Sequence, residues 1–208
     1  QEEHRFLKAA FDTTLHCDGV RSEIQFGHIR RSNHRSTDVE KARFEVCNHK
    51  YSDLSETSYG IALLNDCKYG LSAKEGSMRL SLHKGGMRPD RAGDKGRHVC
   101  RYALLVHDAP FGAESVIRPA YQFNYVPVAK DGVLNVPSLV TVSAPNVIVE
   151  AVKPCEDTDK AYILRLYEAA GDYASVRLSF GHPVERVENC SMLEETQGEA
   201  DTEQLTFR

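Results

Sequence analysis

The sequence contains no tryptophan and no run of about 20 apolar residues, which is the length that a membrane-spanning helix needs. We therefore expect no membrane partner. The first residues, Gln1 to Arg5, are polar or charged and lack the apolar stretch of a secretory signal peptide. The chain also lacks an initiating methionine, so we expect it to be a fragment or a processed piece of a longer protein.

Closely spaced cysteines are missing as well. The six cysteines stand far apart, and none has the Cys-x-x-Cys spacing of a zinc or redox motif. An even number would allow three disulfides, but the wide scatter favours reduced thiols. Without a secretory signal we expect a cytoplasmic, reducing location. Cys47-x-His49 and His98-x-Cys100 would each place two ligands on one strand face. Isolated pairs of this kind rarely bind a metal, so we expect none in this segment.

Motifs of nucleophilic and nucleotide chemistry are absent. There is no Gly-x-Ser-x-Gly elbow, no phosphate-binding Walker loop and no nucleophile beside an obvious base. The acidic segment 194–203 is interpreted as a solvated loop rather than a glycosidase carboxylate pair, because nothing nearby would desolvate it. A net charge of −4 does not favour nucleic acid as a partner. The residues by themselves therefore indicate no catalytic site.

The sequence does contain short segments in which apolar and polar residues alternate, and turn signals separate these segments about every 8–12 residues. They predict an all-β protein built as an antiparallel sandwich, without a long helix. Pro127, Gly132 and Pro137 mark a linker, so we place one domain at residues 1–137 and a second at 138–208.

Several local assignments follow from the same pattern. Residues 23–27 alternate and are predicted to form a strand, whereas residues 28–41 are polar and basic and are predicted to be a solvated loop. Asp53 to Glu56 is predicted to be a turn. Residues 113–123 are ambiguous, because helical spacing is interrupted by Pro119.

The apolar run Ile61 to Leu64 predicts a buried strand, and the polar segment Asn65 to Gly70 follows it directly. A rigid strand that ends in an amide, a carboxylate, an ammonium and a phenol can present a binding site at a sheet edge. Asn, Asp and Gly are equally common in solvated turns for backbone reasons. The residue types alone favour the solvated turn.

Three blocks of the sequence resemble the C-terminal part of glycoside hydrolase family 38 α-mannosidases, in the cytosolic, vacuolar and bacterial branch. They are Glu23 to Arg31 (EIQFGHIRR), Ala42 to Cys47 (ARFEVC) leading into Asp53 to Glu56 (DLSE), and Tyr59 to Gly70 (YGIALLNDCKYG). Later segments fall in matching order, so the resemblance covers nearly the whole chain.

The resemblance implies a retaining, metal-dependent exo-α-mannosidase that acts on an α-mannoside or oligosaccharide. In the family, zinc or a similar divalent metal and the aspartate nucleophile belong to an N-terminal catalytic domain, which would precede Gln1. The resemblance further implies that residues 1–137 are part of a large sandwich of the galactose-mutarotase type. Residues 138–208 would form a smaller β module. We also expect a homo-oligomer, because a chain that contains only part of the sandwich would leave an edge strand exposed for a second copy to pair with.

Loops of the large sandwich contact sugar in the family, which implies substrate-binding roles for Asn65, Asp66, Lys68, Tyr69 and Lys84. Amide, carboxylate and ammonium groups offer directional donors and acceptors to vicinal hydroxyls, and the Tyr69 ring could face a pyranose. Lys84 stands where relatives carry an arginine, and lysine lacks the planar fork of donors. Residues 34–41 also depart from relatives, which carry a tryptophan there.

Two functions of different classes remain open. In the first, the chain completes the fold and the substrate-pocket rim of an α-mannosidase whose catalytic domain lies upstream. In the second, the chain is a stand-alone carbohydrate-binding β-sandwich without catalytic activity. The coding sequence upstream of Gln1 would distinguish the two.

Overall fold

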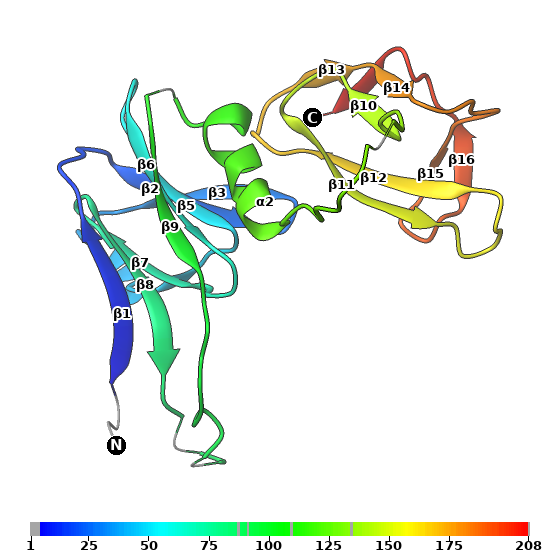
Figure 1. Cartoon of the computed structure of the whole chain (residues 1–208). Helices are drawn as coiled ribbons and strands as arrows, with labels where there is room; N and C mark the ends of the chain where they lie inside the picture. Colours follow the sequence, from blue (N-terminus) through cyan, green and yellow to red (C-terminus); the bar gives the residue numbers. More distant parts are fainter. Residues whose placement is uncertain (1–4, 87, 91, 109, 134, 208) are drawn as a thin grey trace. The chain divides into compact units, whose positions relative to one another are not determined.

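The computed structural model describes residues 5–86, 88–90, 92–108, 110–133 and 135–207. The chain forms two compact units, residues 1–127 and residues 128–208, each with its own strands and apolar core (Figure 1). The strand pairs of the described residues are antiparallel, which confirms the predicted all-β class. The assignment of residues 1–137 and 138–208 to the two family domains stays a prediction.

The first unit contains a five-stranded sheet with the strand order β3-β2-β5-β6-β9. Its strands are β2 (Gly19–Ile24), β3 (Gly27–Ser32), β5 (Tyr51–Ser55), β6 (Gly60–Asn65) and β9 (Tyr102–His107). β6 is the predicted apolar strand, and it pairs with β5 on one side and β9 on the other. It is therefore an interior strand, which explains why its apolar residues are consecutive rather than alternating.

A four-stranded sheet of order β1-β8-β7-β4 packs against the inner face of the first sheet. Its strands are β1 (Phe6–Asp12), β4 (Val46–Cys47), β7 (Gly70–Lys74) and β8 (Ser77–Lys84). Leu54 and Leu63 of one sheet share a core with Leu71, Met78 and Leu80 of the other. Each of these fully buried side chains stabilises the sandwich by about 1.5–3 kcal/mol.

A helical segment covers the outer face of the five-stranded sheet. It consists of a π-helical turn, η1 (Ala113–Ile117), that continues into helix α2 (Arg118–Asn124). Val116, Ile117 and Ala120 are buried on it. The ambiguous segment 113–123 is thus helical. Pro119 lies at the start of α2, directly after the π-helical turn, so its missing N–H falls where the hydrogen-bond pattern changes from π to α.

Two local assignments were wrong in the hairpin that joins β2 and β3. The expected strand at residues 23–27 is interrupted, because Ile24 pairs with Gly27 and the two residues between them form the turn. Phe26 adopts a left-handed φ of 53° there. The expected loop at residues 28–41 contains β3 and a short helix, α1 (Asp38–Ala42), whose first turn is capped by Thr37.

The expected turn at Asp53 to Glu56 was also wrong, because its polar residues are paired inside the sheet. Asp53 is fully buried in β5, where its carboxylate accepts hydrogen bonds from the Ser55 hydroxyl and from Nε2 of His107, 2.9 Å away. Burial raises the pKa of Asp53, while the bonds from Ser55 and His107 act in the opposite direction. Gly60 of β6 faces this group, and a side chain there would meet His107 and Ser55.

The second unit contains four two-stranded antiparallel ribbons in its described residues. They pair β10 (Val140–Val142) with β14 (Leu178–Phe180), β11 (Val147–Pro154) with β12 (Tyr162–Glu168), β13 (Ala174–Val176) with β17 (Leu205–Phe207), and β15 (Glu188–Cys190) with β16 (Thr196–Glu199). Val147, Ala174, Val176 and Leu178 form its core. The acidic segment 194–203, expected to be a loop, thus contributes strand β16.

Candidate functional site

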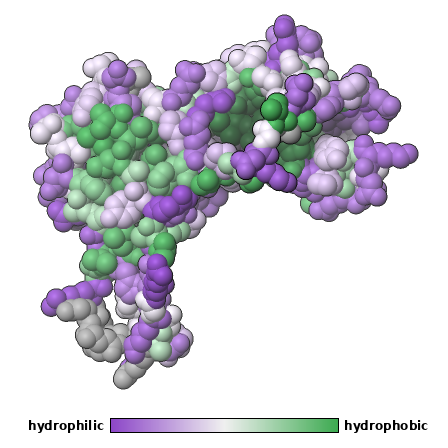
Figure 2. Space-filling model, viewed as in Figure 1, coloured by the Kyte–Doolittle hydropathy of each residue, from purple (hydrophilic) through white to green (hydrophobic). Residues whose placement is uncertain are grey.

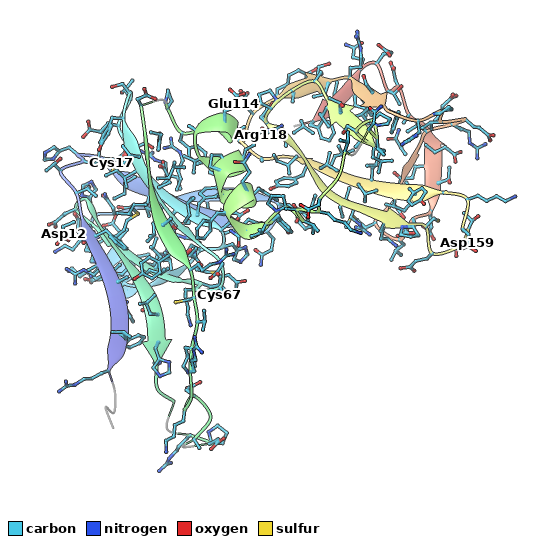
Figure 3. The ribbon with its side chains drawn as sticks, viewed as in Figure 1. Asp12, Cys17, Cys67, Glu114, Arg118 and Asp159 are labelled. Atoms are coloured by element: carbon cyan, nitrogen blue, oxygen red, sulfur yellow. The ribbon has the colours of Figure 1, made fainter. Side chains whose placement is uncertain are left out.

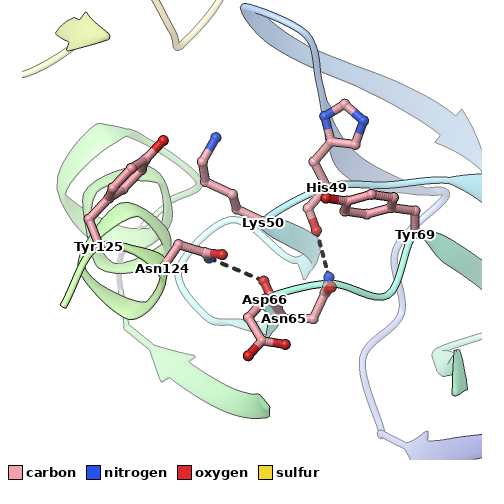
Figure 4. A pocket seen from close by; sticks show the side chains of 7 residues that line it. All are labelled: His49, Lys50, Asn65, Asp66, Tyr69, Asn124 and Tyr125. Carbon is pink, nitrogen blue, oxygen red and sulfur yellow. Dashed lines mark hydrogen bonds between the residues drawn. The ribbon is translucent and has the colours of Figure 1, made fainter. Parts of the chain in front are cut away.

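A pocket of about 400 Å³ lies in the first unit, where β6 ends (Figure 4). β6 contributes its last residue and the polar tip that follows it, the chain just before β5 contributes two residues, and the C-terminal end of α2 contributes two more. The lining residues are His49, Lys50, Asn65, Asp66, Tyr69, Asn124 and Tyr125.

Asn65 forms the floor of the pocket and is almost completely buried. Its Nδ2 donates to Oδ1 of Asn48 at 2.9 Å and to the backbone carbonyl of His49 at 2.5 Å. Its Oδ1 accepts the backbone N–H of Lys68 at 2.8 Å. The amide therefore ties the segment before β5 to the turn after β6, which fixes the pocket's backbone.

Asp66 fastens the end of β6 to the start of β9. Its Oδ1 accepts the Arg101 backbone N–H at 2.9 Å, and its Oδ2 accepts Nε of Arg101 at 3.0 Å. Partial burial opposes ionisation, but the hydrogen bonds from Arg101 outweigh it and lower the pKa of Asp66. Asp66 is therefore a carboxylate at neutral pH, with each oxygen already holding one donor.

Two tyrosine rings stand at the mouth of the pocket. Tyr69 is 56% exposed and meets the His49 ring edge-on at 5.2 Å. Tyr125 is 62% exposed and stacks on Tyr121 at 5.8 Å. Each ring is thus supported by a second ring while keeping much of its own surface open to solvent.

Lys50 provides a fixed cation in the pocket wall. Its Nζ lies 3.0 Å from Oε1 of the buried Glu23 carboxylate and 4.3 Å from the centre of the Tyr121 ring. The backbone N–H of Lys50 donates to Oε2 of the same glutamate at 2.6 Å. Beside it, Nδ2 of Asn124 donates to the Asn65 carbonyl at 3.1 Å, which holds α2 against β6.

The structure brings three of the five predicted residues, Asn65, Asp66 and Tyr69, into one pocket. Lys68 does not line it, and only its backbone N–H contacts the site. Lys84 ends β8 in the other sheet, where its Nζ lies 5.1 Å from the centre of the Phe6 ring. The substrate-binding role of each of the five stays a prediction.

Four lining residues were not predicted as members of the site. His49 was considered only as half of a metal pair, and Lys50 was not considered. The antiparallel register offered a signal for Lys50, because Tyr51 pairs with Leu64 and Lys50 must then lie opposite Asn65. Asn124 and Tyr125 gave no such signal, because α2 reaches the pocket only through the tertiary fold.

The chemistry of the pocket suits an uncharged polar ligand with several hydroxyl groups. An amide, a carboxylate and an ammonium supply donors and acceptors, and the exposed rings supply apolar faces. Among the residues that the structure describes, no three His, Cys, Asp or Glu side chains are grouped closely enough to hold a metal ion. No helix within that part of the chain is long and apolar enough to cross a membrane.

Two family profiles match the chain. The C-terminal domain of glycosyl hydrolases family 38 matches residues 1–92, and the C-terminal beta sandwich domain of the same family matches residues 146–208. The crystal structure of an alpha-mannosidase from Enterococcus faecalis V583 has the same fold, with a TM-score of 0.75 and 16% identity over 97% of this chain and 25% of that one.

Curated relatives extend the match over most of the sequence. Alpha-mannosidase 2C1 of Homo sapiens is 40% identical over 199 residues, and the alpha-mannosidase of Saccharomyces cerevisiae is 33% identical over 208 residues. These alignments cover 93% and 92% of this chain but only 19% of each relative. The chain thus spans about a fifth of the length of these relatives, and it belongs to glycoside hydrolase family 38 as a C-terminal region.

Proposed function

We propose that this chain is the C-terminal region of a metal-dependent, retaining exo-α-mannosidase that removes terminal α-mannosyl residues. The observation that carries the proposal is the 40% identity to a protein named alpha-mannosidase, maintained over 93% of the chain. In this proposal the chain completes the fold and forms part of the rim of the substrate pocket.

Catalysis is assigned to the part of the protein outside this chain. Retaining hydrolysis needs two carboxyl groups flanking the scissile bond, one as nucleophile and one as acid and base. Asp53 is sealed inside the sheet, and Asp66 is held by Arg101, so neither carboxylate is available for that pairing. The described residues do not offer a zinc site either, so we assign the metal to the upstream domain and give it no role here.

The rim role is assigned to the pocket at the end of β6, which we propose to contact the mannoside or oligosaccharide. Its support is the combination of a rigid polar floor with two exposed tyrosine rings. Tyr69 and Tyr125 can cover apolar faces of a sugar ring, while Lys50 and Asn124 can meet its hydroxyl groups. Each of these side chains is held by neighbours, so little side-chain freedom is lost on binding.

The role in completing the fold rests on an open seam along the sandwich. We define this seam as Leu7 of β1 with Tyr102, Leu104 and Val106 of β9, all of which are 40–62% exposed. Apolar side chains gather on this face of the first unit (Figure 2). Both strands lie at sheet edges.

The seam is the uncovered margin of the core rather than ordinary surface. Leu104 pairs with Leu63, which is 1% exposed, so the two side chains share the inner face of the sheet. The Phe11 and Tyr102 rings meet at 6.0 Å, which places β1 beside β9. We propose that the upstream domain of the same protein covers this seam. The proposed homo-oligomer would form where a second copy of this chain pairs with a free edge strand.

A cytoplasmic location is proposed for the whole protein. The six cysteines are free thiols, which is the usual state in a reducing compartment.

Kinetics of the full-length protein test the rim assignment. Tyr69→Ala should lower kcat/KM for an aryl α-mannoside or a mannose oligosaccharide about fivefold, which corresponds to about 1 kcal/mol for one lost ring contact. Tyr59→Ala is the matched control, because Tyr59 is 40% exposed in the same unit but does not line the pocket. Equal kinetics for the two variants would remove the pocket from the substrate site.

Activity of separate parts tests where the catalysis lies. The full-length protein should hydrolyse the aryl α-mannoside and lose activity with a chelator, whereas the 208-residue chain should be inactive with zinc or cobalt. Chelator-sensitive activity in the short chain would overturn the assignment. Mannose binding by a full-length protein without hydrolysis would support the carbohydrate-binding alternative.

A further inference from the structure

The strand ladder between β6 and β9 continues past its last regular pair. Asn65 is paired with Tyr102 at the end of the ladder. The backbone N–H of Asp66 then donates to the Arg101 carbonyl at 3.2 Å, which extends the same register by one position. The next residues in that register are Cys67 and Cys100.

Continuation of this register by one more position would bring the two cysteine side chains together. Hydrogen-bonded and non-hydrogen-bonded pairs alternate along an antiparallel ladder. The bond from the Asp66 N–H to the Arg101 carbonyl is one of the two that a hydrogen-bonded pair makes, while the Arg101 N–H donates to Oδ1 of Asp66 instead. In this register the following, non-hydrogen-bonded position would hold Cys67 and Cys100. Opposed residues there have Cα atoms about 4.5 Å apart, with side chains on the same face. That separation lies within the range of about 4.4–6.8 Å seen for disulfides.

Side-chain contacts support this placement independently of the register. Sγ of Cys67 lies 4.0 Å from the carbonyl oxygen of Val99, the residue before Cys100. Cys100 is also close enough for its charge to contribute to the raised pKa of Cys67. Cys67, labelled in Figure 3, is exposed, and Cys100 is half-buried, so a small thiol reagent can reach both.

We propose that Cys67 and Cys100 form a reversible disulfide that closes a covalent link between the tip of β6 and the start of β9. The oxidant is a small disulfide such as oxidised glutathione. The Cys100 thiolate attacks one sulfur of that disulfide, and one glutathione leaves as a thiolate. The Cys67 thiolate then attacks the Cys100 sulfur of the mixed disulfide and releases the second glutathione. Two protein thiols are oxidised, and one glutathione disulfide is reduced.

The surroundings of Cys67 set the order and the speed of these steps. Burial and the neighbouring Asp66 carboxylate raise the pKa of Cys67 to about 11. Cys67 is therefore protonated at neutral pH, so it acts as the second, resolving thiol rather than the first attacker. Ring closure should accelerate as the pH rises from 7 to 9, because the thiolate fraction of Cys67 increases.

The link would act on the candidate pocket. Asp66 lines the pocket, and its partner Arg101 adjoins Cys100, so a disulfide would reinforce an attachment now made by hydrogen bonds. It would also close a covalent ring around β7, β8 and the segment that leads into β9. A thiol pair that is reduced in the resting state and can be closed by an oxidant is typical of the disulfides found in reducing compartments.

The full-length protein, incubated in glutathione buffers of increasing oxidised fraction, tests the proposal. Peptide mass mapping should find Cys67 joined to Cys100, with the loss of two hydrogen atoms, and reductant should reverse it. Cys67→Ser should stop the reaction at a glutathione adduct on Cys100. Cys47→Ser is the matched control, because Cys47 is also exposed and should leave the link intact. Hydrogen exchange at the Asp66 amide should slow in the oxidised form.

Two results would overturn the proposal. One is glutathione adducts on Cys47 and Cys190 without any link between Cys67 and Cys100. The other is a mixture of pairings in which Cys67 joins several cysteines equally, since the register permits only one partner. Both readouts are independent of mannosidase activity, so they do not depend on the proposed function.

Discussion

Substitution of Gly60 by alanine should strongly destabilise the first unit. An added Cβ would lie 2.5 Å from Nε2 of His107 and 2.5 Å from the Ser55 hydroxyl oxygen, closer than real Cβ atoms approach such groups. His107 and Ser55 would both have to move, and these two side chains hold the buried Asp53 carboxylate. The backbone of Gly60 itself would tolerate alanine, because its φ lies outside the left-handed region.

The size of the effect follows from three contributions. Overpacking a buried site costs about 1–3 kcal/mol. Loss of the hydrogen bond between His107 and the Asp53 carboxylate costs about 1.5–3 kcal/mol. Alanine recovers about 0.4–1 kcal/mol by restricting the unfolded chain. The free energy of unfolding should therefore fall by about 2–5 kcal/mol.

Urea unfolding followed by far-UV circular dichroism measures this loss. With a slope of about 2 kcal/mol per molar urea, the midpoint of the transition should fall by about 1–2.5 M. Gly93→Ala is the control, because a Cβ there meets no atom closer than 3.6 Å, and its midpoint should barely change. An unchanged midpoint for Gly60→Ala would refute the steric argument. So would an equal loss in a His107→Ala background, where the clash with the ring is gone.

Three further substitutions test the charged groups. Burial raises the pKa of Asp53, so its proton is bound more tightly in the folded state than in the unfolded state. The free energy of unfolding should therefore fall as the pH rises from about 4 through the folded-state pKa. Asp53→Asn should flatten that part of a curve of unfolding free energy against pH, and an unchanged slope would contradict this. The pKa of Asp66 is lowered, so its pairing with Arg101 stabilises the fold above pH about 4 and is lost below it. Asp66→Asn should cost about 1 kcal/mol at pH 7 in urea titrations, and this cost should shrink as the pH falls through the lowered pKa of Asp66. A cost that stays constant down to the acid end of the titration would exclude an ionic contribution. Glu23→Gln removes the buried partner of the Lys50 ammonium and should cost about 2 kcal/mol in calorimetric unfolding, whereas an unchanged Tm would mean that the ion pair is energetically neutral.

The parts of the fold that the sequence predicted are those set by local patterning. β6 was predicted because four consecutive apolar residues need burial on both faces, and its polar tip was placed correctly at the end of the strand. The strand at Asp53 was missed for the opposite reason. Aspartate and serine favour turns when their side chains bond to nearby backbone, but here Asp53 bonds to His107, which is far away in the sequence, and Ser55 donates to Asp53.

Three of the seven residues that line the candidate pocket were named in advance. The family resemblance implied binding roles for Asn65, Asp66 and Tyr69, whereas the residue types alone favoured a solvated turn after a buried strand. The structural role of Asn65, whose side chain donates hydrogen bonds to Asn48 and His49, could not be predicted. These partners come close to Asn65 only through strand pairing. Lys84 was grouped with the pocket by resemblance alone, and the register of β8 places it beside β1 in the other sheet.

The open seam makes the amount of folded protein sensitive to substitutions far from any substrate. If the seam is covered by the upstream domain, a polar side chain at Leu104 would weaken the docking of two parts of one polypeptide. The incompletely closed sandwich would be open to proteolysis and to pairing with other chains during synthesis. Such a variant would lower the steady-state level of the protein in cells while each surviving molecule kept its normal turnover.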